Sequence, residues 1–257
     1  LPWAIAAAAA ALATGWGLSV VQPSLAIVPL GLFLLLCGTA PFFPSWGFFG
    51  PTVTRGRADP PGVALTFDDG PDPSTTGPLL DLLRERGIRA AFFVVGRNAA
   101  THPDLVRRMA AEGHEVGNHS ASHDVLLMLR GSRTIARELD RCSEALDAVG
   151  VRTRAFRPPV GIVGPRLFPV LRRRGMFAVA FSRRARDFGN RRVAGLADRL
   201  LPGVRSGDIV LLHDGPVVDE AGTQRWLEEV RHVLDGLAAK GLAVRPLSEH
   251  IDRSVNG

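Results

Sequence analysis

The sequence predicts an α/β domain with a parallel β-sheet, preceded by two apolar helices able to enter a membrane. Residues 1–54 carry no charged side chain, whereas all 31 basic and 25 acidic residues lie from Arg55 onward. After residue 61, short apolar runs alternate with amphipathic segments, which is typical of parallel strands covered by helices on both faces. Polar residues follow several of these runs, where parallel strands usually place active sites.

The uncharged residues 1–46 predict a transmembrane helical hairpin. Two apolar stretches, 1–21 and 25–44, flank a short break, and each is long enough for a span of ~20 residues. Trp3 and Trp46 lie near the outer ends of the pair, where aromatic side chains favour the membrane interface. We therefore expect a protein anchored in the cell membrane and in contact with lipid.

Three other interpretations of this segment stay open. The first stretch could be a signal peptide, although it lacks a basic start and the apolar pattern resumes at once. The pair could be core helices of a soluble protein, although neither has a charged face to meet water. Pro29 and the prolines between 41 and 44 could shorten the second helix to a re-entrant piece.

Residues 47–61 are rich in proline and glycine and are expected to be a linker. The globular domain is expected over 62–250, followed by a tail, 251–257. Its strands are predicted from their apolar runs at 63–67, 90–95, 115–118, 155–157, 176–181, 208–212 and 242–247.

The helices predicted between these strands have apolar residues at helical spacing, and several end at a glycine, which suits a helix C-terminus. They are expected at 78–86, 104–112, 132–149, 164–174 and 223–240. About seven strand–helix units follow, which either an open doubly wound sheet or a closed barrel would satisfy.

Two adjacent carboxylates, Asp68 and Asp69, follow the first strand of this domain. Neighbouring side chains diverge at a strand end, so the two can take different tasks. Like charges so close raise one pKa unless a cation lies nearby. The plainer interpretation is an acidic turn, because Asp-Gly-Pro is good turn chemistry.

Two histidines, His119 and His123, follow the third strand. At a spacing of four they would share one face of a helical turn and could bind one ion. With Asp69 they supply a His₂–carboxylate set, which leaves coordination positions open for water and substrate. An isolated pair at this spacing is more often not a metal site.

Three further motifs follow later strands. Arg157 opens Arg157-Pro158-Pro159-Val160-Gly161, where the prolines could hold the arginine rigidly. Asp187 follows the fifth strand and His213 ends the sixth. Each has an ordinary structural explanation, a rigid turn or a buried histidine, when it is considered alone.

In their order along the chain, these motifs resemble the five motifs of the NodB-homology polysaccharide deacetylases, similar to carbohydrate esterase family 4. The matching segments are TFDDGP, HSASH, RPPVG, the segment around Asp187, and LLHD. The resemblance covers roughly 62–250 and implies a distorted (β/α) barrel of about seven parallel strands. The chain departs from the family where aromatic residues are common, with Val160, Phe181 and Phe188 in their place.

The resemblance also implies a role for each site residue. Asp69, His119 and His123 match the metal ligands of a divalent ion, with Zn²⁺ expected first. Asp68 matches the general base, and Arg157 matches its ion-pair partner. His213 matches the general acid, and Asp187 matches the carboxylate that orients it.

The expected activity is hydrolysis of N-acetyl groups from amino sugars of a polysaccharide or oligosaccharide. The alternatives are deacetylation or deformylation of a lipid-linked sugar at the membrane face, and an inactive carbohydrate-binding module. The scattered arginines show no nucleic-acid motif, and we expect neither a nucleic-acid nor a protein partner. Arg55 and Arg57 favour a cytoplasmic domain, whereas a wall-glycan deacetylase would act outside, so the side stays open.

Overall fold

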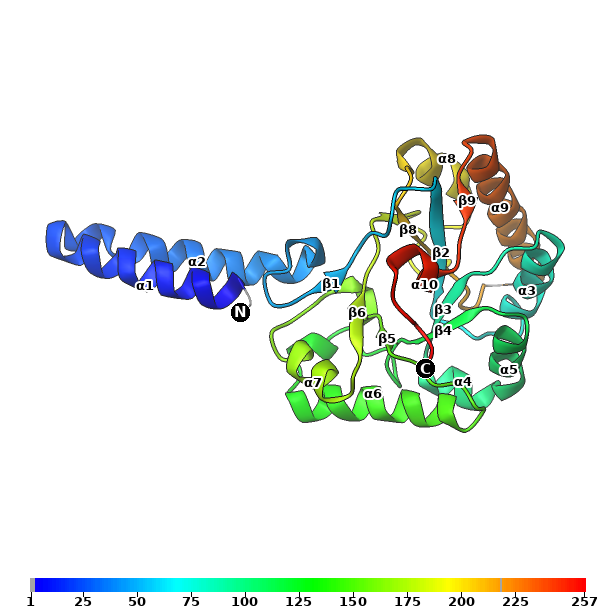
Figure 1. The fold of residues 1–257 in the computed structure, drawn as a ribbon, viewed down its shortest axis with the longest axis horizontal. Coiled ribbons are helices and arrows are strands. Elements are labelled where there is room, and N and C mark those ends of the chain that lie inside the picture. The colour runs from blue at the N-terminus through cyan, green and yellow to red at the C-terminus, as the bar shows by residue number, and fades with distance from the viewer. Residues whose placement is uncertain (1–2, 218) are drawn as a thin grey trace.

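The computed structural model describes residues 3–217 and 219–257 and has two parts, an apolar hairpin and an α/β domain (Figure 1). Helices α1 (Trp3–Val21) and α2 (Ile27–Thr39) lie side by side and project away from the domain. A 3-10 turn, Pro23–Leu25, joins them at the far end. The start of α1 and the end of α2 therefore lie at the end of the hairpin that is next to the domain.

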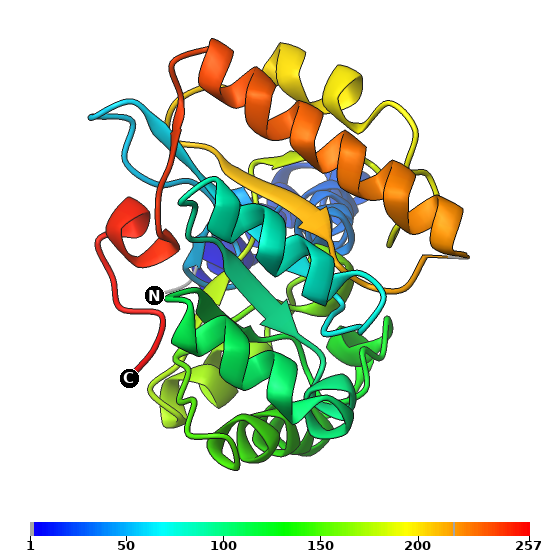
Figure 2. The same ribbon diagram turned by 90° about the vertical axis from the view of Figure 1, so that its right-hand side faces the viewer.

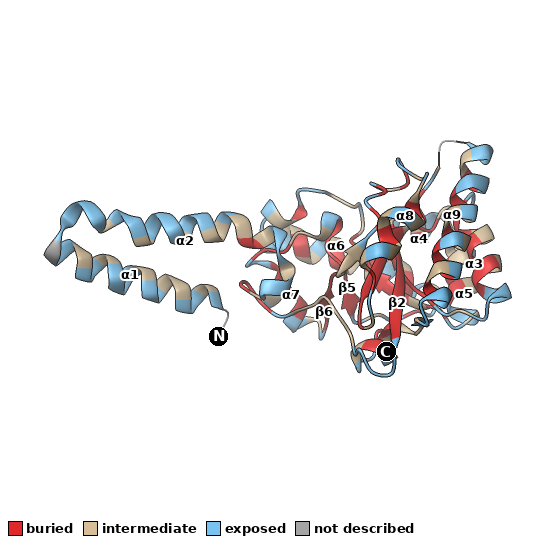
Figure 3. Ribbon diagram, turned by 90° about the horizontal axis from the view of Figure 1, so that it is seen from above, coloured by how far each residue is buried: buried red, intermediate tan, exposed pale blue. Residues whose placement is uncertain are grey.

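The hairpin leaves its apolar surface uncovered. By length and composition, the stretches Trp3–Val20 and Pro23–Phe42 could each cross a membrane, with mean hydropathies of 1.5 and 2.1. The first stretch has 0% of its residues buried and the second has 6%, whereas the strands of the domain are buried (Figure 3). The two helices are thus not core helices of this domain.

Within the described residues, nine parallel strands form one curled sheet in the order β1-β6-β5-β4-β3-β2-β8-β7, with β9 beside the start of β2. The strands are β1 (Thr52–Val53), β2 (Gly62–Asp68), β3 (Ala91–Val94), β4 (Glu115–Asn118), β5 (Ala155–Phe156), β6 (Phe177–Val179), β7 (Arg183–Arg184), β8 (Ile209–His213) and β9 (Ala243–Val244). Just after β1, Arg55 forms an antiparallel bridge with Asp208, which precedes β8. The curled sheet confirms the expected distorted barrel and excludes the open doubly wound sheet.

Helices cover the outer face of this sheet (Figure 2). They are α3 (Thr76–Glu85), α4 (Gly96–Thr101), α5 (Pro103–Ala111), α6 (Ser132–Asp147), α7 (Leu167–Arg173), α8 (Leu196–Leu200), α9 (Glu220–Ala239) and α10 (Leu247–Ile251). The core is dense: all of β2 is buried, Phe67 stacks on Phe92 at 5.3 Å between ring centroids, and Trp226 of α9 is fully buried. Burial of this apolar surface is the main stabilising contribution.

The structure differs from the expected elements at the last strand. Residues 242–247 were expected to be extended throughout, but β9 ends at Val244 and α10 begins at Leu247. Pro246 precedes the helix, and a proline cannot donate a ladder hydrogen bond. The short helices α4, α8 and α10 were not predicted, since so few residues carry little periodicity.

The ordered unit also extends on both sides of 62–250. The expected linker contributes β1, and it buries Phe48 and Phe49 against the base of the hairpin. In the expected tail, Val255 is buried and its carbonyl accepts a hydrogen bond from Arg154 N at 2.8 Å. These contacts join residues far apart in the chain, which local composition does not reveal.

Candidate active site

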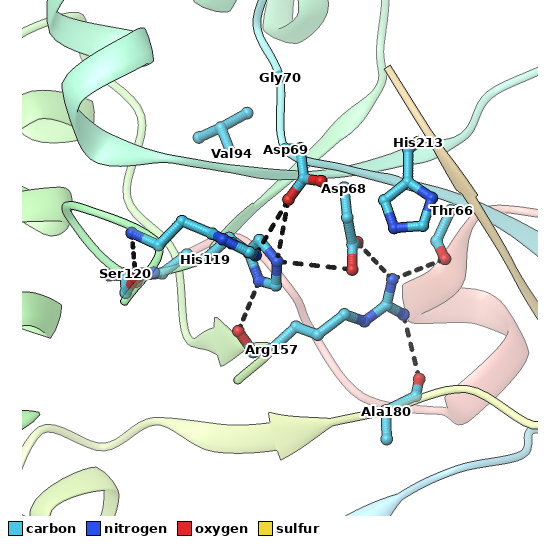
Figure 4. A network of polar contacts seen from close by, with 12 residues as sticks. Thr66, Asp68, Asp69, Gly70, Val94, His119, Ser120, Arg157, Ala180 and His213 are labelled. Atoms are coloured by element: carbon cyan, nitrogen blue, oxygen red, sulfur yellow. Dashed lines mark hydrogen bonds and ion pairs between the residues drawn. The ribbon is translucent and has the colours of Figure 1, made fainter. Parts of the chain in front are cut away.

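The residues singled out from the sequence converge at the carboxyl ends of the strands. Asp68 ends β2 and lies in register with His213, which ends β8. His119 follows β4 and Arg157 follows β5. Because neighbouring parallel strands end at the same edge of a sheet, these side chains meet although they are far apart in sequence (Figure 4).

Asp69, His119 and His123 form one compact cluster. One ligand atom from each lies within 4.8 Å of the others. Asp69 Oδ1 is 3.5 Å from His119 Nε2 and 3.2 Å from His123 Nε2. Two imidazoles and one carboxylate around a common point are the donor set that Zn²⁺ and related ions accept.

The spacing of the two histidines suggested a helical turn, but the structure places them on a loop. Residues 119–126 form an irregular loop in which Ser120 and His123 have φ of 66° and 56°. The Ser120 hydroxyl accepts a hydrogen bond from the His123 N–H at 3.0 Å, which stabilises this tight fold of the backbone. The left-handed residues therefore aim both rings at Asp69, a conformation that spacing cannot predict.

The cluster has the hydrogen bonding expected of metal ligands. His119 Nδ1 is 2.7 Å from the Arg157 carbonyl oxygen, so Nδ1–H donates and Nε2 is the ring nitrogen that faces Asp69. Asp69 Oδ1 is buried and has no hydrogen-bond partner within the described residues. An acceptor left bare beside two imidazole nitrogens suits a cation at this point, so these residues fit a divalent ion.

Charge in the cluster keeps the carboxylate ionised. Burial alone would raise the pKa of Asp69, but the close approach and charge of His119, with the charges of His213 and His123, hold that pKa well below its usual range. Burial and the charge of His119 lower the pKa of His123. An ionised carboxylate and a neutral imidazole are the protonation states that bind a metal.

A buried ion pair positions Asp68. The Arg157 guanidinium, with no exposed surface, donates from Nη1 to Asp68 Oδ1 at 2.7 Å and to Thr66 Oγ1 at 2.8 Å. Its Nη2 donates to the Ala180 carbonyl at 3.0 Å, and its Cζ lies 3.9 Å from the centre of the Phe93 ring. This geometry locks one carboxylate oxygen of Asp68 and leaves Oδ2 near the Asp69–His119–His123 cluster, 3.7 Å from His119 Nε2.

A second pair, His213 and Asp187, lies across the site. His213 Nδ1 donates to Asp187 Oδ1 at 2.8 Å, and the Asp187 side chain is almost fully buried. Burial alone would lower the pKa of His213, but the hydrogen bond and charge of Asp187, with Asp69 and Asp68, raise it to about 9. His213 is therefore protonated at neutral pH and can act as an acid.

Six of the seven predicted residues line one cavity of about 440 Å³, and Arg157 lies behind its wall. Val160, at φ 53°, also lines the cavity, and its N–H has no acceptor among the described residues. A β-branched residue in this region is strained, which is common where the backbone serves a site. Phe181 and Phe188 supply the aromatic walls.

Asp214 was not predicted as a site residue, yet it fixes the loop that carries Asp69. Its carboxylate accepts hydrogen bonds from Gly70 N at 3.1 Å and Thr76 Oγ1 at 2.7 Å. Burial raises the pKa of Asp214 to about 7, against the effect of these two bonds. Its only signal in the sequence is its place directly after His213.

Comparison with known proteins gives consistent matches. The family model described as polysaccharide deacetylase matches residues 55–181. A chitooligosaccharide deacetylase of Sinorhizobium fredii is 34% identical over 207 residues, which cover 77% of this chain and 96% of the relative. A peptidoglycan-N-acetylglucosamine deacetylase of Bacillus cereus is 36% identical over 60% of this chain and 72% of its own length.

A solved structure has a similar fold. The crystal structure of the Bc1960 peptidoglycan N-acetylglucosamine deacetylase has a TM-score of 0.72 and 26% identity to this chain. The similarity covers 80% of this chain and 95% of that structure, so it extends over nearly the whole of the α/β domain.

Proposed function

Because this chain belongs to the polysaccharide deacetylase family, we propose that it hydrolyses the N-acetyl group of N-acetylglucosamine residues in a glycan. Members of this family are hydrolases, and the chain is a deacetylase. The observation that carries the proposal is one cavity in which the Asp69–His119–His123 cluster lies beside Asp68, with His213 also in its wall.

The proposed cofactor is a divalent ion held by Asp69, His119 and His123, with Zn²⁺ the first candidate from the donor set. When bound, such an ion would polarise the amide carbonyl and lower the pKa of a water molecule. Asp68, held through Oδ1 by Arg157, accepts a proton from the attacking water at Oδ2.

The remaining steps use Val160 and His213. Val160 lines the cavity and its N–H has no acceptor among the described residues, so this N–H stabilises the oxyanion that develops on the carbonyl oxygen of the acyl group. His213, held by Asp187, donates its proton to the leaving nitrogen, so that the amide C–N bond breaks with loss of an amine. Acetate and the free amino sugar are the products.

A bell-shaped pH dependence of kcat/KM is expected, because Asp68 must be ionised and His213 protonated. The alkaline side should fall as the pH rises through about 9, where His213 loses its proton. The variant Asp187→Asn removes the negative charge that raises the pKa of His213, so the alkaline fall in kcat/KM should move to lower pH by ~1–2 units.

The control for that variant is Asp198→Asn, whose carboxylate is exposed on α8. It should leave the pH profile unchanged. If Asp187→Asn loses activity with an unmoved alkaline fall, His213 is not the group that titrates there.

Metal binding tests the ligand set directly. We expect His123→Ala to weaken binding of the divalent ion by more than ~100-fold. Loss of a residue that only hydrogen-bonds to a metal ligand weakens binding by ~10- to 100-fold, and loss of a ligand itself should cost more. Deacetylation should be lost with the ion. Elemental analysis after dialysis, beside acetate release with and without chelator, measures both effects.

The matched control is His232→Ala, a histidine exposed on α9. It should retain the ion and the activity. One ion per chain in His123→Ala would remove this residue from the ligand set.

The hairpin anchors the domain to a membrane, supported by two uncovered apolar helices of sufficient length. The inactive-module alternative is disfavoured because the cluster, the Asp68–Arg157 pair and the His213–Asp187 pair are all present in one site.

A further inference from the structure

A second cavity of about 580 Å³ opens beside the active-site cavity. The two share part of their walls, the residues Val160, Gly161, Phe181, Arg184 and Arg186. A substrate whose amino sugar lies at the metal cluster can therefore extend into the second cavity. The proposed deacetylation steps do not require this space.

The second cavity is strongly positive. Four arginines line it, Arg183, Arg184, Arg186 and Arg199, and none of its described lining residues is acidic. Arg184 and Arg186 are exposed and form no ion pair with any described residue. Guanidinium groups without carboxylate partners are suited to a phosphoryl group, which they bind through paired N–H donors.

The other two arginines contribute charge rather than free donors. Arg199 donates to the main-chain carbonyls of Ala185, Ala194 and Arg192 and has no acidic partner within the described residues. Arg183 Nε lies 3.6 Å from Asp208 Oδ2, so its charge is partly compensated. The positive charge of Arg199 therefore remains uncompensated near Arg184 and Arg186.

The base of the apolar hairpin forms another part of the cavity wall. Phe42, Phe43, Pro44 and Ser45 line it, and Phe42 and Phe43 are 64% and 47% exposed. The Val163 N–H donates to the Pro41 carbonyl at 3.1 Å, which joins the hairpin base to the loop that carries Val160. Exposed phenylalanines at the end of an apolar hairpin are suited to contact with acyl chains at the membrane surface.

We propose that the second cavity binds the phosphoryl group of a lipid-linked substrate, an N-acyl amino sugar joined through phosphate to an apolar chain. The sugar lies at the metal cluster, the phosphate against Arg184 and Arg186, and the apolar chain passes Phe42 and Phe43 toward the bilayer. This inference rests on the proposed deacetylation and specifies its substrate class.

The reaction itself is unchanged by this assignment. The oxygen of water bonds to the acyl carbon, the amide C–N bond breaks, and the amine takes the proton. The phosphate ester stays intact and serves only for recognition. The lipid of the substrate and the hairpin of the enzyme would lie in the same membrane. This raises the local concentration of the substrate at the enzyme.

The test compares four substrates with full-length, metal-loaded protein in detergent micelles. They are N-acetylglucosaminyl phosphate esterified to a prenyl alcohol, the same sugar joined to that alcohol by an uncharged glycosidic bond, N-acetylglucosamine 1-phosphate, and a chito-oligosaccharide. Acetate release gives kcat/KM for each. We expect the first to exceed the second by ~10- to 100-fold because only the first offers a phosphate to Arg184 and Arg186. It should exceed the third by ~10-fold or more because only a lipid-linked substrate enters the micelle that holds the enzyme.

The variant Arg184→Gln/Arg186→Gln should reduce the preference for the phosphorylated lipid over the uncharged lipid by a similar factor. The control Arg89→Gln/Arg225→Gln changes the net charge equally, at exposed positions before β3 and on α9. It should leave the preference unchanged. A preference that is equal in the two double variants would overturn the role of Arg184 and Arg186.

The remaining outcomes separate the inference from the proposed function. Equal kcat/KM for the two lipids overturns phosphate recognition, and equal kcat/KM for the phosphorylated lipid and N-acetylglucosamine 1-phosphate overturns lipid recognition. Turnover of the chito-oligosaccharide alone overturns this inference and leaves the proposed function intact. No acetate from any of the four substrates would overturn both.

Discussion

In Asp68→Asn, kcat for deacetylation should fall by ~10²- to 10⁴-fold, the range for loss of a general base. The amide of Asn cannot accept the proton of water at neutral pH, although its oxygen can still accept the hydrogen bond that Arg157 now gives to Oδ1. The fold and the Asp69–His119–His123 cluster should therefore persist. Acetate release and metal content, measured on the same preparation, test both expectations.

The matched control for this variant is Asp104→Asn, an exposed carboxylate at the start of α5. It should keep the wild-type kcat. A value within ~10-fold of wild type in Asp68→Asn would exclude Asp68 as the general base. A low kcat with loss of the metal would instead assign Asp68 to metal binding.

Replacement of Arg157 by Met should lower the free energy of unfolding by ~3–5 kcal/mol, the usual result of removing one partner of a buried ion pair. The Asp68 carboxylate would remain buried without its cation, and Thr66 Oγ1 and the Ala180 carbonyl would each lose a donor. Urea unfolding of metal-free protein at neutral pH measures this effect, because a bound ion would also compensate the charge of Asp68.

A double variant separates the charge effect from lost packing. Asp68→Asn/Arg157→Met leaves no uncompensated charge in the pair, so it should be more stable than Arg157→Met alone. Arg152→Met, at a side chain that is 84% exposed, is the control and should change stability little. If the double variant is as unstable as Arg157→Met, the loss arises from packing and main-chain hydrogen bonds.

Arg157 also links the predicted base to a predicted metal ligand. Arg157 accepts a hydrogen bond at its carbonyl from His119 and donates from its guanidinium to Asp68. One residue therefore orients both a predicted metal ligand and the predicted base. A lysine could supply the charge but not the fork of donors, so Arg157→Lys should restore part of the stability and less of the activity.

Several features could be predicted from the sequence because they depend on local composition. The absence of charge before Arg55 indicated the apolar hairpin, and the apolar runs located most strands and long helices to within a few residues. The order of the motifs along the chain indicated the family and the fold, and both are confirmed. The positions of polar residues at strand ends follow from the same pattern, since burial ends where the strand leaves the core.

Other features depend on contacts between distant residues, and only the tertiary structure decided them. The left-handed backbone at Ser120 and His123, the hold of Asp214 on the Asp69 loop, and the pairing of β1 with β6 have no local signature. The second cavity arises where the hairpin base meets arginines more than 100 residues later in the chain.

By itself, the sequence determined which segments are apolar, which of them end in chemically active residues, and to which family the chain belongs. Apolar periodicity is a local property, and the motifs and their order are visible along the chain without any contact between them. The tertiary structure decided how the sheet curls, how the loop that carries His119 and His123 is folded, and where the arginines lie opposite the base of the hairpin. These depend on packing and on the low dielectric of the interior, which act only after distant residues have been brought together.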